Sequence, residues 1–419
     1  MLQSETTRKY DTYKDSGIEW IGEIPQDWTV IKIKYLAKIT SGDGLTKELL
    51  CENGNFPVFG GGSIIGYTNN YNTTPDNILI GRVGANCGCI TWLNNNCWAT
   101  DNALKVKLMA NFHKKLFYYF LISLELNRLN DSNAQPLITS TKILNTFVSY
   151  PADIQEQQRI AEYLDKKCGE IDRVVETEKS VIEKLKEYKQ SIITEAVTKG
   201  LDKSAPLKDS GIEWIGKIPQ HWEVRKLKTI GDYRNGLTYS PEDMCEEEQG
   251  TLVLRSSNIR RGKLFLNDNV YVSVDIPNVL KVQKGDILVC SRNGSRDLIG
   301  KNAIIDSDIN ASFGAFMMIL RCNCPKYMYY ILNSHIFNYY LGSFFTSTIN
   351  QLTGKNFGGM DIVFCPDTSE QNAIIEYLDQ KCSEIDKAIA DKEQVIEKFT
   401  EYKKSLIYEC VTGKRKVVE

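Results

Sequence analysis

The sequence predicts an α+β protein in which two globular modules are joined by two long helices that form an antiparallel coiled coil. The first observation is a duplication: the segment Asp15–Trp28 returns, nearly unchanged, as Asp209–Trp222. The second is that a longer segment, Glu156–Thr198, returns as Glu370–Thr412. The stretches between these matches have diverged, which is typical of one frame built twice around two different inserts. We therefore expect an internal pseudo-two-fold repeat.

The two repeats divide the chain into seven segments. Each copy of the shorter repeat, here called a strap, holds a proline between two tryptophans. A continuous helix is thereby ruled out, and an ordered strap that docks on a larger surface is favoured. The expected segments are an N-terminal tail with its strap (1–28), a first module (29–152), a first long helix (153–201), the repeated strap (202–222), a second module (223–367), a second long helix (368–413) and a C-terminal tail (414–419).

Both modules are expected to mix strands and helices. In the first module, short β-branched runs separated by glycine turns predict strands within 77–108, and the apolar spacing of 113–126 predicts a helix. The second module repeats this order, with strands within 286–322 and one helix over 326–341. The two modules therefore have one ancestry and different loops.

The repeated helical segments carry an apolar stripe that advances by three and four residues. A stripe of this period, sustained over this length, predicts a coiled-coil seam. One charged residue interrupts the stripe at the equivalent position of each copy. The predicted seam residues are Leu164, Ile171, Val175, Glu178, Ile182 and Leu185 in the first helix, and Leu378, Ile385, Ile389, Lys392, Ile396 and Phe399 in the second.

The two long helices are expected to run antiparallel, because copies related by a two-fold axis perpendicular to the rods point in opposite directions. Equivalent residues then meet only near that axis. Glu178 and Lys392 are equivalent, opposite in sign and within the seam. We hypothesise that they pair across the axis and set the register, as a single polar seam position can. The alternative is two independently solvated charges.

Composition is that of an ordinary soluble globular protein. Of the 419 residues, 42% are hydrophobic and 25% are charged, and the formal net charge is −2. Binding to nucleic acid would therefore have to use local patches. The 12 cysteines and 3 histidines show no zinc-site spacing, so the cysteines are expected to be core residues in a reducing cytosol. Without a signal peptide or an apolar run of membrane-spanning length, a cytoplasmic protein with no membrane contact is expected.

Motifs for catalysis and for metal binding are missing. Gly294–Lys301 comes nearest to a phosphate-binding loop, but it has one residue too many before its second glycine, and Asn302 replaces the magnesium-binding Ser or Thr. Gly60–Gly66 lacks the spacing of a dinucleotide fingerprint. No histidine-centred triad stands out. We therefore expect no catalytic residue, no metal site and no cofactor in this chain.

Polar, glycine-rich loops in both modules are the candidates for DNA contact. The common base contacts are paired hydrogen bonds from an Arg guanidinium to guanine and from an Asn side-chain amide to adenine. Ser, Lys and backbone amides usually bind the phosphates. Such loops are also ordinary turns, so each residue is a hypothesis. A further polar loop, Thr346–Phe357, has a counterpart in Leu137–Ile143. The candidate residues are Tyr67, Asn69, Asn70, Arg82 and Asn86 in the first module, and Arg255, Asn258, Arg260, Arg261, Arg292, Asn293, Ser295, Arg296 and Lys301 in the second.

Together these segments resemble the specificity subunit of a type I restriction-modification system. The resemblance covers Asp15 to about Lys416. It rests on the duplicated SGIEWIG-x-IPQ-x-W strap, on the runs GGGSIIGYT, ILIGRVGA and ILVCSRNGS-x-x-LIGK, and on the exits PADIQEQQ and PDTSEQN into the helices. It implies that the two modules are target recognition domains and that the helices are a spacer and docking platform.

The resemblance further implies a non-catalytic subunit that binds double-stranded DNA at a two-part site. Two modification subunits, which bind S-adenosylmethionine, would methylate one adenine in each half of the site. Restriction subunits would add translocation and cleavage that depend on ATP and Mg. About 40 helical residues give a rod of roughly 60 Å, which bounds the gap between the half-sites at about 18 base pairs.

Two other classes of function stay open. A structural coiled-coil scaffold whose modules bind proteins is favoured slightly by the weak net charge, and it is opposed by the Arg- and Asn-rich loops and by the resemblance. A self-sufficient nuclease would need a cluster of metal-binding carboxylates, which the sequence does not show.

Overall fold

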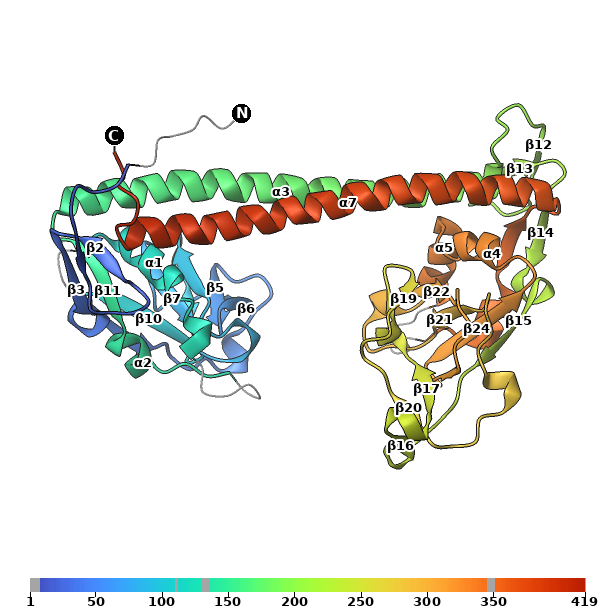
Figure 1. Cartoon of the computed structure of the whole chain (residues 1–419), viewed down its shortest axis with the longest axis horizontal. Coiled ribbons are helices and arrows are strands. Elements are labelled where there is room, and N and C mark those ends of the chain that lie inside the picture. The colour runs from blue at the N-terminus through green and yellow to red at the C-terminus, as the bar shows by residue number, and fades with distance from the viewer. Residues whose placement is uncertain (1–7, 110–111, 130–135, 345–350, 419) are drawn as a thin grey trace. The chain divides into compact units, whose positions relative to one another are not determined.

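The computed structural model describes residues 8–109, 112–129, 136–344 and 351–418 and divides the chain into two compact units. The first unit comprises Met1–Lys179 and Glu393–Glu419, and the second comprises Ser180–Lys392. Each unit contains one module together with parts of both long helices, α3 (Ile154–Lys199) and α7 (Thr368–Val411) (Figure 1).

The first module is built on a four-stranded antiparallel sheet with a smaller sheet beside it. The large sheet has the order β4 (Ala37–Ser41), β10 (Ala103–Leu108), β7 (Asn77–Gly81), β8 (Ile90–Leu93). The smaller one has the order β6 (Ser63–Thr68), β5 (Phe56–Gly60), β9 (Trp98–Ala99), with β5 and β9 parallel. Strand β3 (Trp28–Lys32) pairs with β11 (Phe147–Pro151), and the helices are α1 (Lys114–Ser123) and α2 (Ser140–Asn145).

The second module repeats this plan with different strand lengths. Its large sheet has the order β15 (Gly231–Asn235), β24 (Met317–Cys322), β21 (Ile287–Cys290), β22 (Asn302–Ile304). Its other sheet has the order β16 (Met244–Cys245), β20 (Tyr271–Val272), β17 (Thr251–Leu254), β23 (Ala311–Phe313), with β17 and β23 parallel. A short hairpin joins β18 (Ile259–Arg260) to β19 (Lys263–Leu264), and β14 (Glu223–Lys226) pairs with β25 (Asp361–Phe364). The helices of this module are α4 (Pro325–Ile331), α5 (His335–Phe344) and α6 (Gly354–Gly359).

The matching sheet orders confirm the predicted fold class, an α+β protein with an internal repeat. One prediction within the second module is wrong. The expected single helix over 326–341 is two helices, α4 and α5, separated by a turn. In that turn the Asn333 side chain donates to the Tyr329 carbonyl at 2.7 Å, and Ser334 Oγ donates to the Ile331 carbonyl at 2.7 Å. Such side-chain bonds to the backbone compete with helix continuation.

A buried indole joins each strap to the first turn of a long helix. In the first unit Trp28 is buried, and its Nε1 donates to Glu156 Oε1 at 3.3 Å. In the second unit Trp222 is buried, and its Nε1 donates to Glu370 Oε2 at 3.0 Å. The predicted docking surface of each strap is thus a helix start.

Each strap also forms a small hairpin that contacts a helix end. The hairpins pair β1 (Tyr13–Asp15) with β2 (Glu23–Pro25) and β12 (Leu207–Asp209) with β13 (Lys217–Pro219). In the first unit Lys414 Nζ, just beyond α7, donates to the carbonyls of Ile21 and Glu23. In the second, Lys199 Nζ at the end of α3 donates to the carbonyls of Ile215 and Lys217.

Glycines end both long helices in the left-handed conformation. Gly200 has a φ of +71° and Gly413 a φ of +72°. A Cβ at Gly413 would lie 2.2 Å from Pro25 Cδ, so only glycine fits the chain between the helix end and the first strap.

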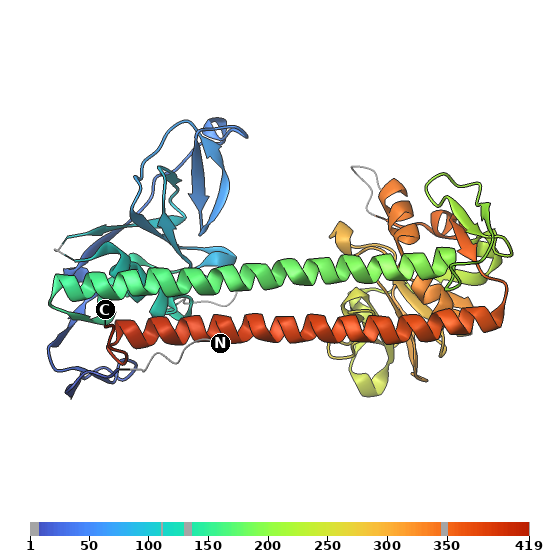
Figure 2. The ribbon, with the colours of Figure 1, turned by 90° about the horizontal axis from the view of Figure 1, so that it is seen from above.

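Within each unit, α3 and α7 lie side by side and run in opposite directions (Figure 2). In the first unit Asp172 accepts from Lys403 Nζ at 2.7 Å, and in the second Asp386 accepts from Lys189 Nζ at 2.6 Å. The two aspartates occupy equivalent positions of the repeat, and so do the two lysines. Each ion pair is therefore a copy of the other, and both units share one antiparallel register.

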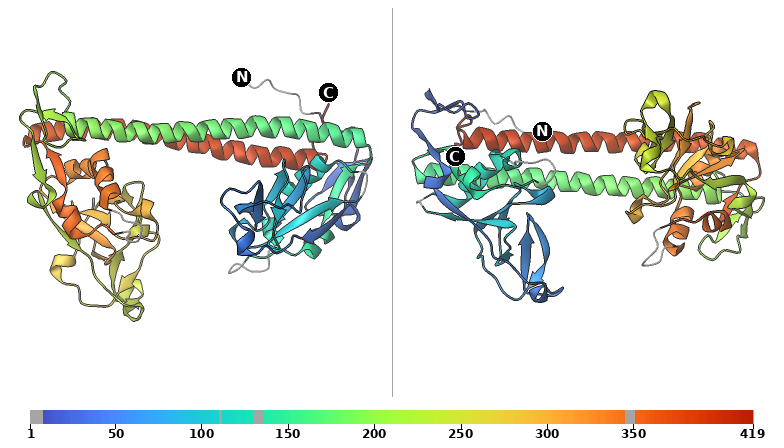
Figure 3. Two further views of the ribbon diagram at one scale, coloured as in Figure 1. Left: turned by 180° about the vertical axis from the view of Figure 1, so that it is seen from behind. Right: turned by 90° about the horizontal axis from the view of Figure 1, so that it is seen from below.

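The apolar seam positions are buried or half-buried in both units. In the first unit Leu164 and Ile171 belong to one hydrophobic core with Leu406, and Val175 and Phe399 pack against it. Because this core also includes residues of the sheet, the helices and the module of the first unit form one packed body (Figure 3).

The predicted pairing of Glu178 with Lys392 stays a prediction. Glu178 belongs to the first unit and Lys392 to the second. The segment boundaries drawn from the repeats also stay predictions, although the ends of α3 and α7 lie close to them. Over the described ranges, no helix is both long and apolar enough to cross a membrane.

The hydrogen bond between Trp222 and Glu370, here called the junction of the second unit, makes the stability of that unit depend on pH. Burial raises the pKa of Glu370, but hydrogen bonds from His221, Trp222 and Cys365 outweigh burial and hold the pKa below its ordinary value. A carboxylate with a depressed pKa stabilises the fold above its unfolded pKa, and this stabilisation is lost as the pH falls through the folded pKa. We expect Glu370→Gln to lower the Tm clearly at neutral pH and much less near about pH 3.

The measurement is thermal unfolding followed by circular dichroism at both pH values. Glu376→Gln, at an exposed position of the same helix, is the control and should leave the Tm unchanged. An equal loss of Tm at both pH values would contradict the role given to the ionised Glu370.

Candidate nucleic-acid interface

The second module carries a groove with a volume of about 930 Å³. Four segments form most of its walls: the connection after β17, the connection after β21, the turn between β23 and β24, and the segment from β15 to β16. The first two are the polar loops that the sequence singles out. The lining residues used below are Arg255, Ser256, Asp268, Arg292, Asn293 and Phe316.

Ser256 holds the two predicted loops together. Its Oγ accepts from Asn293 Nδ2 at 3.1 Å, and its carbonyl accepts from Lys301 Nζ at 2.9 Å. Burial is the main cause that lowers the pKa of Lys301, and the nearby Arg260 lowers it further. Lys301 is outside the groove lining, and its ammonium group is engaged by the backbone of the loop after β17.

Arg255 is engaged on the opposite wall. Its Nη2 lies 3.1 Å from Asp268 Oδ2 and donates to the Asp268 carbonyl at 3.2 Å. Its buried Nε has no hydrogen-bond partner among the described residues. Arg255 is therefore held in the wall of the groove by Asp268.

The prediction that Asn258 contacts DNA is not supported by its position. Its side chain is 0% exposed. Asn258 Oδ1 accepts from the Arg255 backbone N–H at 2.8 Å, and Nδ2 donates to the carbonyls of Phe265 and Asp268 at 3.1 and 3.3 Å. The amide holds the loop in shape, which the sequence pattern alone does not distinguish from base contact.

Arg292 lies over the ring of Phe316 at the groove. The guanidinium carbon of Arg292 lies 5.1 Å from the centroid of the Phe316 ring, and Phe316 is 57% exposed. The backbone N–H of Arg292 also donates to the Phe316 carbonyl at 3.1 Å. The sequence analysis missed Phe316, whose only signal was an aromatic residue two positions after Gly314.

The remaining candidates of the second module lie beside the groove. Arg260 is exposed, and its guanidinium carbon is 3.8 Å from the centroid of the Phe265 ring. Arg261 has a φ of +52° in the turn of the β18–β19 hairpin. Ser295 and Arg296 are exposed around a short 3-10 helix that follows the β21 loop. These residues suit contacts outside the groove, of the kind that phosphates receive.

In the first module the predicted residues form two separate groups. Arg82 lies at the end of β7, where Nη1 donates to Ser41 Oγ at 3.0 Å and Nε is buried without a hydrogen-bond partner among the described residues. Asn86 is half-buried in the turn that follows. These two residues stabilise the β7–β8 hairpin, and they also carry hydrogen-bond donors that DNA could use.

The second group lies on the β5–β6 hairpin. Tyr67 was expected in a loop but belongs to strand β6, where it is exposed. Asn69 and Asn70 follow that strand and are also exposed. Two apolar side chains that the sequence analysis did not single out, Ile64 and Ile65, are exposed on the same strand. This hairpin offers amide and apolar groups without a cation, unlike the groove of the second module.

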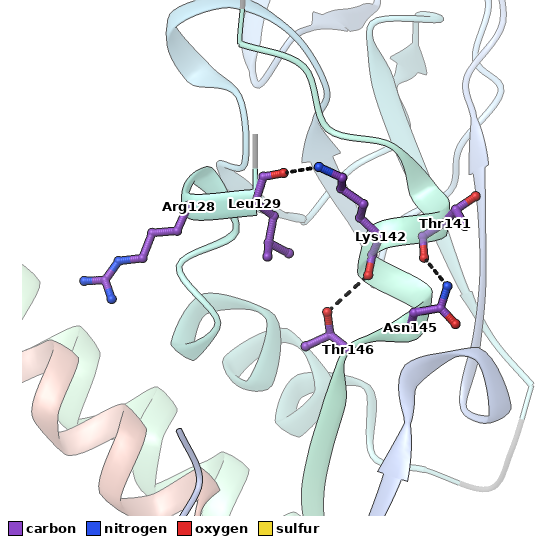
Figure 4. A pocket seen from close by; sticks show the side chains of 6 residues that line it. All are labelled: Arg128, Leu129, Thr141, Lys142, Asn145 and Thr146. Carbon is purple, nitrogen blue, oxygen red and sulfur yellow. Dashed lines mark hydrogen bonds between the residues drawn. The ribbon is translucent and has the colours of Figure 1, made fainter. Parts of the chain in front are cut away.

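A second hollow, of about 500 Å³, lies beside α2 in the first module (Figure 4). Its polar groups mostly bind one another. Lys142 Nζ donates to the Leu129 carbonyl at 3.1 Å, and Thr146 Oγ1 donates to the Lys142 carbonyl at 3.2 Å. We assign it no ligand.

The polar loop expected at Thr346–Phe357 lies partly outside the described residues, which resume at Gln351. The described part leads into α6, where Thr353 Oγ1 accepts from the Asn356 backbone N–H. Over the part of the chain that the structure describes, no group of three or more His, Cys, Asp or Glu side chains could hold a metal ion.

The sequence matches the family described as the type I restriction modification DNA specificity domain over residues 25–187 and again over 219–398. These two matches cover most of the chain and coincide with its two repeats. The chain belongs to this family. The predicted family resemblance is thereby confirmed.

Among curated relatives, the MjaVIII specificity subunit of Methanocaldococcus jannaschii is 24% identical over 418 residues, which is 94% of each chain. The EcoKI specificity subunit of Escherichia coli K12 and the StySPI specificity subunit of Salmonella potsdam are each 26% identical. These two alignments cover 48% and 47% of this chain and 44% of each relative. The chain thus spans less than half the length of those two relatives.

One solved structure from a study of complex assembly and conformational transition of the type I restriction-modification system shares the fold. It aligns with a TM-score of 0.64 and 13% sequence identity, covering 93% of this chain and 98% of the other. At this identity the similarity concerns the fold alone.

The buried amide of Asn258 generates a prediction about the groove wall. Asn258→Ala removes four polar contacts and leaves buried backbone groups unsatisfied, so we expect a loss of about 1–3 kcal/mol of stability and faster hydrogen exchange over residues 255–269. Hydrogen exchange by mass spectrometry measures both effects. Asn70→Ala, at an exposed position, is the control. Unchanged exchange over the loop would show that Asn258 does not hold it.

Proposed function

We propose that this chain is the DNA specificity subunit of a type I restriction-modification complex and that it reads a two-part double-stranded site, one half with each module. The observation that carries this proposal is the duplication of one sheet order under two different loop chemistries. Because both modules share one sheet order, each would contact its half of the DNA site in the same orientation. Because their loops differ, the two half-sites would have different sequences.

The loop chemistry of the two modules differs at equivalent positions. Val83 bridges to Leu137 in the first module as Arg292 bridges to Gln351 in the second. The second module therefore places a guanidinium where the first has an apolar side chain. The first module instead exposes Tyr67 and two asparagines on its β5–β6 hairpin. Arg suits guanine and Asn suits adenine, so the two modules should prefer different bases.

The proposed role is binding without catalysis. Loop side chains would enter the major groove, while exposed Lys, Arg and Ser residues would hold the phosphates. Two modification subunits that bind S-adenosylmethionine would methylate one adenine in each half after the base leaves the stack. Restriction subunits that use ATP and Mg would cleave the DNA. This chain supplies position and sequence choice to both kinds of partner.

A structural scaffold that binds only proteins is the second candidate, favoured by the net charge of −2. The Arg292 side chain, exposed over Phe316 at the groove, offers donors that suit a base edge or a phosphate, and this favours DNA over a protein partner.

Module exchange tests the proposed division of labour. Replacing Thr29–Tyr150 with the corresponding module of a relative should change one half of the methylated site and leave the other half unchanged. The measurement is long-read sequencing of methylated adenines in cells that carry the complete system. A change in both halves, or in neither, would refute the two-module proposal.

The helices present one exposed tyrosine at the same repeat position in each unit. Tyr402 of the first unit is 47% exposed, and Tyr188 of the second is 58% exposed. Exposed tyrosines are frequent energetic centres of protein interfaces. Because they are equivalent, we assign each to one of two identical modification subunits.

Tyr402→Ala and Tyr188→Ala should each weaken the binding of one modification subunit by at least about 2 kcal/mol, and the double variant should bind neither copy tightly. Mass photometry of the mixed subunits measures the stoichiometry. Tyr35→Ala, at an exposed tyrosine of the first module, is the control. Retention of two copies by the double variant would rule out this docking surface.

A further inference from the structure

The cations of the second module differ in how far the protein already engages them. Arg255 pairs with Asp268, and Lys301 donates to the Ser256 carbonyl. Arg260 lies over a ring outside the groove lining. The Arg292 guanidinium, by contrast, has no ion pair or hydrogen bond among the described residues, and it lies over the Phe316 ring. Its five donors are thus available at the groove.

Phe316 fixes the position of that guanidinium. The backbone N–H groups of Ser291 and Arg292 donate to the Phe316 carbonyl at 2.9 and 3.1 Å, so the loop after β21 is tied to the turn before β24. The ring then lies against the guanidinium, which restricts a side chain that would otherwise sample many rotamers.

We propose that Arg292 determines one base of the second half-site by reading a guanine through its major-groove edge, with Phe316 as the positioning residue. This inference rests on the proposed function. Guanine presents two acceptors, N7 and O6, that match the Arg fork. The Arg fork also binds phosphates through two parallel hydrogen bonds, and the two contacts differ in that only base reading makes affinity depend on sequence.

The same pair is missing from the first module at the equivalent place. Val83 occupies the position of Arg292 in the paired bridge. The guanine contact should therefore belong to the second half-site only.

The experiment uses the full chain with its modification subunits. Methylated sites are sequenced in cells for the wild type, Arg292→Ala, Phe316→Ala and Phe316→Tyr, and the binding of duplexes with each base at every second half-site position is measured. For Arg292→Ala we expect one fixed guanine to become degenerate, with a loss of about 5- to 150-fold for the original duplex and an unchanged first half-site. Phe316→Ala should weaken the same preference, and Phe316→Tyr should restore it.

Arg225→Ala is the matched control. Arg225 also lies over a phenylalanine ring, that of Phe364, at 5.5 Å in the same unit, but it is outside the groove lining. It should change no base preference. Circular dichroism shows whether each variant folds.

Three outcomes would overturn the inference. If Arg292→Ala keeps the same preferred sequence while the wild type methylates a two-part site, the inference fails and the proposed function stands. A loss of affinity that is equal for all sequences would identify a phosphate contact instead. If the wild-type complex methylates no two-part site, the proposed function fails and the inference fails with it.

Discussion

The hydrogen bond between a buried indole and the glutamate at the start of a long helix is the interaction on which each unit depends. It fixes the strap, the first strand of the module and the helix at one point. A buried tryptophan needs a partner for its N–H, and a carboxylate in the first helical turn is also stabilised by the helix dipole. One pair of side chains therefore meets two requirements at once. The remaining strands and helices of the module follow in the chain from the strand that this hydrogen bond holds in place.

The junction tolerates different neighbours in the two units. In the first, Tyr10 donates to Glu156 at 2.7 Å, whereas in the second His221 and Cys365 contact Glu370. The common part is the indole and the carboxylate. Loops farther from the junction can change without disturbing it, because their hydrogen bonds are mostly internal, as those of Asn258 are. This separation of frame from loops is what allows two unlike modules to share one chain.

Much of the frame could be predicted from the sequence, because the repeat and the apolar stripe extend over many residues. Both long helices and the presence of strands in each module follow from such patterns, whereas the order of the strands in each sheet came from the structure. The competition between side-chain hydrogen bonds to the backbone and the hydrogen bonds of the helix was not predictable from the sequence. Asn333 and Ser334 divide a helix whose apolar spacing continues through them. The loop residues were found as a class, but composition does not tell a buried amide such as Asn258 from an available guanidinium such as Arg292. Phe316 needed the fold to bring it beside Arg292.

The weak net charge constrains how such a chain can recognise DNA. Sequence-independent affinity comes mainly from neutralising phosphates, and a chain with a formal net charge of −2 has little surplus charge for that purpose. Selectivity must then come from a few oriented groups, each already held by the protein before DNA arrives. The Arg292–Phe316 pair meets this condition, because its loop is tied to the neighbouring turn through backbone hydrogen bonds. Any attraction to phosphates would then have to come from local clusters of Lys and Arg, such as those around the loops of the second module, because the charge of the whole chain does not supply it.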